Sequence, residues 1–287
     1  MLSSFLDFRR SWRKYLAFSL VYLLVASYIF VPIFGYLINR LLISMGSGVL
    51  LNRDVFRIFL NPRGIAGLFI LAAAAVMIIF VEIGTLIIYS QKKYFQRDIM
   101  LSEAIVTAVL QVRRIIGIGI FYLIFILLVL VPLIELPITP LITDRLDLPP
   151  LIMDNIMDSW ITRGLHGLIL LIMIYLLLRW IFTLHFILLE NQKTHQAIRS
   201  SVRLTQKSRF SILVKLLFLN LMLFIGGFGI LALLARIPVM TTWRLTVLMS
   251  QYLVTFTSFI GLLFSLMSLP INIIFLTRLY YQEISRI

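Results

Sequence analysis

Residues 64–90 read GIAGLFILAAAAVMIIFVEIGTLIIYS, and Glu82 is the only charged residue in this stretch. An α-helix needs about 20 mostly apolar residues to cross the roughly 30 Å hydrocarbon core of a bilayer. No water is available to backbone N–H and C=O groups inside that core, so a spanning segment must satisfy them within itself. The length and apolarity of this stretch therefore predict a transmembrane helix.

Five further stretches have the same character. The chain has 287 residues, of which 61% are hydrophobic and 13% are charged, whereas soluble domains have about 45–50% apolar and about 25% charged residues. The additional predicted spans are residues 15–38, 115–136, 164–189, 211–235 and 246–277, and Pro270 is expected to kink the last one. The sequence thus predicts an all-α, polytopic integral membrane bundle of about six transmembrane helices, forming a single domain over residues 1–287.

The distribution of Lys and Arg predicts the orientation of these spans, because cytoplasmic loops of membrane proteins carry an excess of basic residues. If the N-terminus is cytoplasmic, 17 of the 26 basic residues fall in cytoplasmic segments, eight fall in outer segments, and Arg179 lies within a span. We therefore expect a multi-pass protein of the cell membrane with both termini in the cytoplasm. The same distribution explains the net charge of +14 without a nucleic-acid partner.

Two short amphipathic helices are predicted in the cytoplasmic loops. In the first, apolar residues from Ile105 to Val112 recur at helical spacing and are followed by Arg113 and Arg114. The second carries three basic residues along one face: Arg199, Arg203 and Lys207. Helices of this kind lie in the headgroup plane, where each basic residue near anionic lipid contributes on the order of 1 kcal/mol. Membrane lipids are the expected partners of these basic residues, either through specific headgroup recognition or through ordinary cytoplasmic anchoring.

Ionisable residues inside the predicted spans form a second set of candidates, because a charge in hydrocarbon is costly and often functional. Glu82 and Arg179 are predicted at similar depth, and His185 lies one to two turns from Arg179. If Glu82 and Arg179 pair, they form a structural clamp, a polar floor for a headgroup, or a proton or ion relay. Alternatively, Arg179 snorkels towards the headgroups. Asn220 either joins this polar layer or links two helices.

Several short motifs, taken in order along the chain, resemble one bacterial family. They are Ser11-Trp12-Arg13, Leu51-Asn52-Arg53, Asn61-Pro62 and the sequence AIRSSVRLT at residues 197–205. Together they resemble the membrane domain of bacterial glycerophosphoryl diester phosphodiesterases. In that family the membrane region precedes a barrel that cleaves glycerophosphodiesters with the help of a divalent cation. The resemblance implies a membrane domain that works with such a barrel.

The chain departs from the family's complete enzymes in its catalytic part. The barrel begins with a His-Arg-Gly run, and none of His166, His185 and His195 is followed by Arg-Gly. A barrel of about 250 residues does not fit after the sixth predicted span, and the chain has no cysteine. We therefore expect no catalytic site, metal site or cofactor in this chain, and a separate phosphodiesterase catalytic domain as a partner.

Three functions are compatible with these features. The first is a non-catalytic membrane domain that anchors a glycerophosphodiester phosphodiesterase or presents lipid-like substrate to it. The second is a small transporter or channel that uses the polar layer of Glu82 and Arg179. The third is a membrane assembly or interaction factor. Uptake of a substrate that is abolished by Glu82→Gln would favour the second function over the first.

Overall fold

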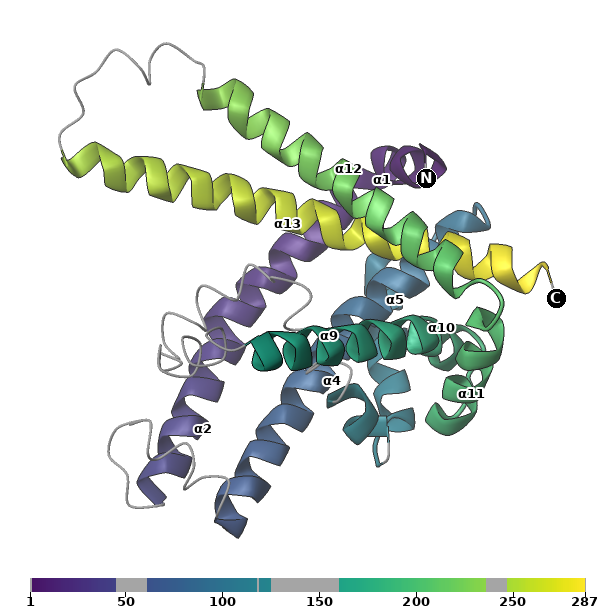
Figure 1. Cartoon of the computed structure of the whole chain (residues 1–287), viewed down its shortest axis with the longest axis horizontal. Coiled ribbons are helices and arrows are strands. Elements are labelled where there is room, and N and C mark those ends of the chain that lie inside the picture. Colours follow the sequence, from purple (N-terminus) through teal and green to yellow (C-terminus); the bar gives the residue numbers. More distant parts are fainter. Residues whose placement is uncertain (1, 45–60, 118, 125–159, 236–246, 287) are drawn as a thin grey trace.

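The computed structural model describes residues 2–44, 61–117, 119–124, 160–235 and 247–286 (Figure 1). Within these ranges the elements are helical and no strand occurs, so the predicted all-α membrane fold is confirmed. The helices are α1 (Leu2–Val25), η1 (Ala26–Phe30), α2 (Val31–Ser44), α4 (Pro62–Tyr94), α5 (Leu101–Gln111), η2 (Val112–Arg114), α9 (Trp160–Trp180), α10 (Thr183–Leu189), α11 (Thr194–Thr205), α12 (Arg209–Ala235) and α13 (Val247–Ile284).

Four segments of the described chain are long and apolar enough to cross a membrane. They are Ser3–Ser44, Pro62–Tyr94, Leu171–Leu189 and Arg209–Gly227. These segments overlap the first, second, fourth and fifth predicted spans. Most of the predicted third span, residues 115–136, lies outside the described residues. The predicted sixth span falls within α13 from residue 247 onwards, and the total of six crossings stays a prediction.

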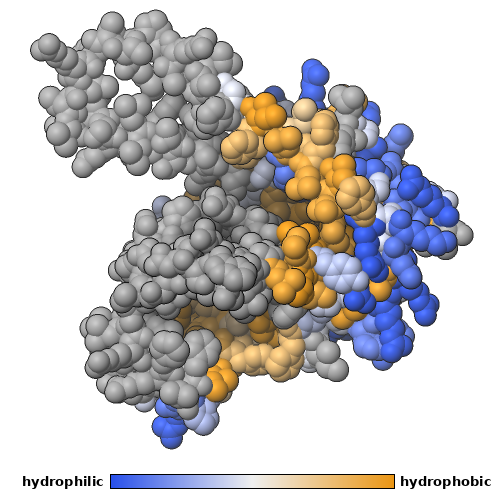
Figure 2. Space-filling view, in the orientation of Figure 1, coloured by the Kyte–Doolittle hydropathy of each residue, from blue (hydrophilic) through white to orange (hydrophobic). Residues whose placement is uncertain are grey.

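Several helix ends meet on one side of the molecule, and that side is polar. Helix α1 is kinked at Ser11, and Figure 1 shows the rest of α1 with η1 and α2 as one long rod beside α4, and α12 beside α13. The start of α1, together with α5, α11 and the last turns of α13, forms what we call the polar end. Hydrophilic residues gather on this side of the molecule, next to an apolar middle region (Figure 2). Large apolar side chains such as Leu20, Ile70 and Phe224 are exposed on the rod, α4 and α12, as expected for helices that face lipid.

Local sequence signals account for the boundaries of α4. The side chain of Asn61 accepts a hydrogen bond from the backbone N–H of Arg63 at 3.0 Å, and Pro62 occupies the first helical position. Both features are favourable at a helix start. Lys92 and Lys93 lie in the last turn, where a positive charge interacts favourably with the helix dipole. These residues explain why this long apolar helix begins and ends where it does.

The first predicted amphipathic helix is present as α5, which packs against α4. A Cβ atom at Gly84 of α4 would lie 3.3 Å from the Cβ of Ala108 and 3.3 Å from Leu188. Small residues therefore allow the two helices to approach closely. Ala104 and Ala108 form the buried face of α5, whereas Val109 is half exposed.

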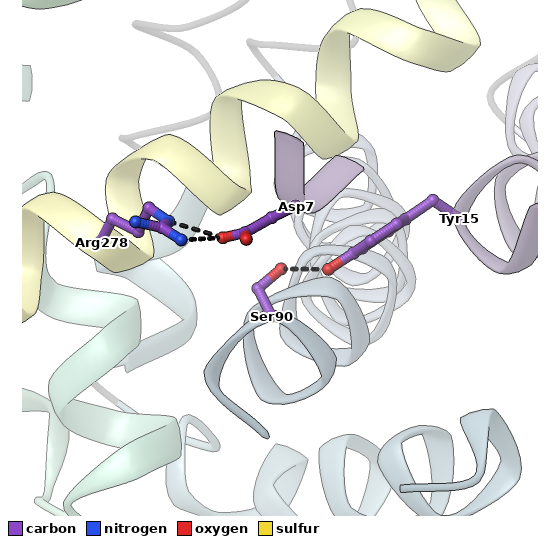
Figure 3. Close-up of polar contacts among 4 residues, drawn as sticks. All are labelled: Asp7, Tyr15, Ser90 and Arg278. Carbon is purple, nitrogen blue, oxygen red and sulfur yellow. Dashed lines mark hydrogen bonds and ion pairs between the residues drawn. The ribbon is translucent and has the colours of Figure 1, made fainter. Parts of the chain in front are cut away.

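Polar contacts join the start of α1 to α4 and α13 (Figure 3). The Nε of Arg278 donates to Oδ2 of Asp7 at 2.6 Å, and a second nitrogen of Arg278 contacts the same oxygen. The hydroxyls of Tyr15 and Ser90 are 3.1 Å apart. The first turns of α1 therefore lie beside the last turns of α13. That this end faces the cytoplasm stays a prediction.

Candidate functional site at the polar end

The fourth predicted span contains a break that the sequence did not predict. Helix α9 ends at Trp180 and α10 begins at Thr183, with a turn between them. Ser201 of α11, which is 0% exposed, fills this break. Its Oγ donates to the carbonyl of Arg179 at 2.9 Å and accepts from the N–H of Phe182 at 3.2 Å. Ser201 thus satisfies two backbone groups at the break, which stabilises it within an apolar region.

Buried polar side chains surround this break. The hydroxyl of Tyr122 donates to Oγ1 of Thr183 at 2.9 Å. His185 is 2% exposed, its Nε2 lies 3.2 Å from Oγ1 of Thr277, and its ring stacks on Tyr280 with 5.1 Å between the ring centroids. His185 is therefore a core residue that links α10 to α13.

The second predicted amphipathic helix is present as α11, and its basic residues are exposed as expected. Ala197, Ser201 and Leu204 are buried against the rest of the structure. Arg199 and Arg203 are exposed on the other face, and Lys207 is exposed just beyond the end of the helix. An amphipathic helix with such a basic face is suited to anionic headgroups.

An open pocket of about 360 Å³ lies between α11 and the ends of α10 and α13. Its lining residues are Phe186, Glu190, Ser200, Arg203, Leu204 and Ile284. Glu190 accepts hydrogen bonds from the hydroxyl of Tyr280 and from Nε2 of Gln192, the latter at 2.9 Å. The pocket therefore offers an exposed guanidinium and a carboxylate that is already hydrogen bonded.

The structure brings the two predicted amphipathic helices together, which the sequence did not indicate. Oγ1 of Thr194, at the start of α11, donates to the carbonyl of Arg114 at 3.2 Å. Nε2 of Gln111 donates to Oδ1 of Asn191 at 2.7 Å. Arg113 is exposed, whereas Arg114 is partly buried. These hydrogen bonds join two loops that are distant in sequence into one surface.

The three predicted members of the intramembrane polar layer lie in different environments. Glu82 is one turn from Ile78, whose carbonyl accepts the Tyr22 hydroxyl, so Glu82 lies on the side of α4 that faces α1. Arg179 contacts Tyr175, at 5.7 Å from its guanidinium carbon to the ring centroid. No ion pair joins Glu82 to Arg179 in the described parts of the chain. In the described residues, Arg179 packs on Tyr175 and His185 contacts Thr277 and Tyr280, and no hydrogen bond or ion pair joins either of them to Glu82.

Asn220 takes the second of its two predicted roles. Its amide exchanges reciprocal hydrogen bonds with the amide of Asn272, each at 3.1 Å. The pair links α12 to α13, and α13 continues as a helix through Pro270. Across the residues that the structure describes, no group of three or more His, Asp or Glu side chains is placed to hold a metal ion.

Comparison with known proteins identifies the family. A family model described as the membrane domain of glycerophosphoryl diester phosphodiesterase matches residues 1–286. The chain belongs to this family. The resemblance noted in the sequence is thereby confirmed, and the matched family is a membrane domain and not a catalytic domain. No curated protein and no solved structure matches the chain.

Proposed function

We propose that this membrane domain anchors a glycerophosphoryl diester phosphodiesterase and presents lipid-like substrate to it at the polar end. The observation that supports the proposal is the placement of α11. Its basic residues Arg199 and Arg203 are exposed, and Arg203 also lines the pocket with Glu190. Ser201 holds the opposite face of this helix against the break between α9 and α10. A charged surface is thus fixed to helices that are anchored in lipid.

The chemistry of this surface suits a phosphodiester. Guanidinium groups bind phosphate oxygens through charge-assisted hydrogen bonds, which are about twice as strong as neutral ones. Each Lys or Arg near an anionic membrane surface adds about 1 kcal/mol of attraction. Arg199, Arg203 and Lys207 would concentrate phosphate-bearing headgroups beside the pocket. The carboxylate of Glu190 offers an acceptor for a headgroup hydroxyl.

The structure gives less support to a transporter. Transporters often bind substrate at the exposed backbone of broken helices. Here Ser201 occupies the backbone groups at the break between α9 and α10. No ion pair joins Glu82 to Arg179, the residues that motivated the transporter interpretation, within the ranges that the structure describes.

The proposal is tested by joining the full chain to a soluble phosphodiesterase barrel of this enzyme family in vesicles that contain phosphatidylglycerol. We expect hydrolysis of a membrane-embedded lysophospholipid to fall several-fold in Arg199→Gln/Arg203→Gln/Lys207→Gln. Hydrolysis of water-soluble glycerophosphocholine should not change, because that substrate reaches the barrel from solution. The matched control, Arg9→Gln/Arg10→Gln/Arg13→Gln, removes three exposed charges from α1.

Two results would contradict this function. The first is equal hydrolysis of the lysophospholipid by the wild-type chain, the triple variant of α11 and the matched control. The second is hydrolysis of glycerophosphodiesters by the chain without a barrel. The purified chain alone, in lipid and with added divalent cation, is expected to show no hydrolysis of glycerophosphodiesters, so cation-dependent turnover would contradict a non-catalytic role.

A further inference from the structure

Two arginines that are distant in sequence share one tyrosine ring at the contact of α9 and α12. The guanidinium carbon of Arg179 lies 5.7 Å from the centroid of Tyr175, and that of Arg209 lies 5.3 Å from the same centroid. Nη1 of Arg209 also donates to the hydroxyl of Tyr175 at 3.0 Å. We call Tyr175, Arg179 and Arg209 the arginine–tyrosine cluster. It places two positive charges against the same ring, and neighbouring like charges are unfavourable without a nearby anion.

The protein does not supply that anion within the part of the chain that the structure describes. Both arginines have a buried Nε without a hydrogen-bond partner. Of the carboxylates in these ranges, Asp7, Asp98 and Glu283 pair with Arg278, Lys93 and Arg286. Glu190 is hydrogen bonded to Tyr280, and no described carboxylate forms an ion pair with Arg179 or Arg209. A partly buried guanidinium is stabilised by an anionic partner, so an external anion fits the cluster.

The position of the cluster identifies the kind of anion. Arg209 is the first residue of the apolar span of α12, whereas Tyr175 and Arg179 lie within the apolar segment Leu171–Leu189. Tyr175 is 45% exposed, and the neighbouring apolar side chains of Leu171 and Phe210 are 66% and 78% exposed. Acyl chains would cover these side chains, while a phosphate group would reach the two guanidinium groups.

We propose that the arginine–tyrosine cluster binds the phosphodiester group of one membrane phospholipid at the contact of α9 and α12. Arg179 and Arg209 would each donate to phosphate oxygens, a geometry that suits the planar guanidinium fork. Tyr175 holds both side chains in place through its ring and hydroxyl. The site is separate from the basic face of α11 and does not require a phosphodiesterase partner.

The test measures phospholipid bound to the purified full chain in detergent, by native mass spectrometry during titration with phosphatidylglycerol or phosphatidylethanolamine. We expect the wild-type chain to retain phospholipid and Arg179→Gln/Arg209→Gln to bind it at least about tenfold more weakly, because two charge-assisted hydrogen-bonding groups are lost. The matched control Arg9→Gln/Arg10→Gln, which removes two exposed charges at the polar end, should bind like the wild type.

Further arms identify the ligand and guard against misfolding. Arg179→Lys/Arg209→Lys keeps both charges but removes both guanidinium forks, so it should also bind phospholipid more weakly than the wild type. This variant serves as the test if Arg179→Gln/Arg209→Gln does not fold. Diacylglycerol, which lacks phosphate, should not compete. Displacement by soluble glycerophosphocholine would identify a free phosphodiester as the ligand, whereas resistance would identify a lipid. Equal retention by the wild-type chain and both double variants, or equal binding of diacylglycerol, would overturn the proposal.

The result is separable from that of the phosphodiesterase experiment. If Arg179→Gln/Arg209→Gln loses the retained phospholipid but hydrolyses lysophospholipid normally, the arginine–tyrosine cluster is supported. The α11 surface is then judged by its own variants. If Arg179→Gln/Arg209→Gln retains phospholipid normally while the α11 triple variant hydrolyses lysophospholipid poorly, the phospholipid site alone is overturned.

Discussion

Ser201 holds together two elements through one hydroxyl group. It contacts a carbonyl and an N–H that the break between α9 and α10 leaves without helical partners. A buried polar backbone group without a partner costs about 1–3 kcal/mol. Ser201 therefore contributes to the stability of the fold by satisfying both of these backbone groups.

We expect Ser201→Ala to destabilise the protein by about 1–3 kcal/mol, because the backbone groups of Arg179 and Phe182 would lose their shared partner. Ser102→Ala, at an exposed position of α5, is the matched control and should change stability by no more than about 0.5 kcal/mol. Reversible unfolding of both variants in mixed detergent micelles measures the difference. Equal stability of the two variants would show that water or a local rearrangement replaces Ser201.

The sequence predicted some residues of the polar end and not others. Arg199, Arg203 and Lys207 were predicted as an exposed basic face, because their spacing alone defines one side of a helix. Ser201 and Tyr175 gave no comparable signal. Their roles depend on contacts with residues about 20 to 35 positions away, and a single sequence carries no information on such contacts.

At the scale of elements, the amides of Asn220 and Asn272 link α12 to α13. Each side chain also donates to a carbonyl in its own helix, at Leu216 and Ser268. Polar links between membrane helices contribute about 0.6 kcal/mol on average and up to about 1.7 kcal/mol. The pair therefore contributes modestly to stability and more clearly to the register of the two helices.

A double-mutant cycle with Asn220→Ala and Asn272→Ala tests this link. We expect each single substitution to destabilise the protein, and the double variant to lose about 0.5–1.5 kcal/mol less than the two single losses together. The measurement is unfolding free energy in micelles. Additive losses would mean that the two amides act independently.

Some element boundaries carry an explicit sequence signal and others do not. Asn61 and Pro62 mark the start of α4, and the structure begins the helix there. The break at Ile181 and Phe182 has no Gly or Pro, so residues 164–189 were expected to form one continuous span. The break depends on a partner serine in α11, and the helix preference of its own residues does not reveal it.

At the scale of the molecule, the absence of cysteine makes the predicted orientation directly testable. Single cysteines at Gln206 and Gln282 report on the polar end, and single cysteines at Ser44 and Arg63 report on the opposite ends of α2 and α4. All four positions are exposed. Each variant thus provides one reactive thiol without a background signal.

We expect a membrane-impermeant maleimide to label Ser44→Cys and Arg63→Cys in intact cells, and to label Gln206→Cys and Gln282→Cys only in inside-out vesicles. This pattern follows from the excess of basic residues on the cytoplasmic side. The reverse pattern would invert the orientation. Labelling of Gln206→Cys and Gln282→Cys from opposite sides would contradict the shared polar end.

The contact between the end of α13 and the pocket has a consequence for any domain attached to this end of the chain. Ile284 lines the same pocket as Arg203 and Glu190. A domain that follows α13 through a short flexible linker would encounter this pocket at an effective concentration in the millimolar range. Weak intrinsic affinity would then suffice for frequent encounters, and the length of the linker would regulate their frequency.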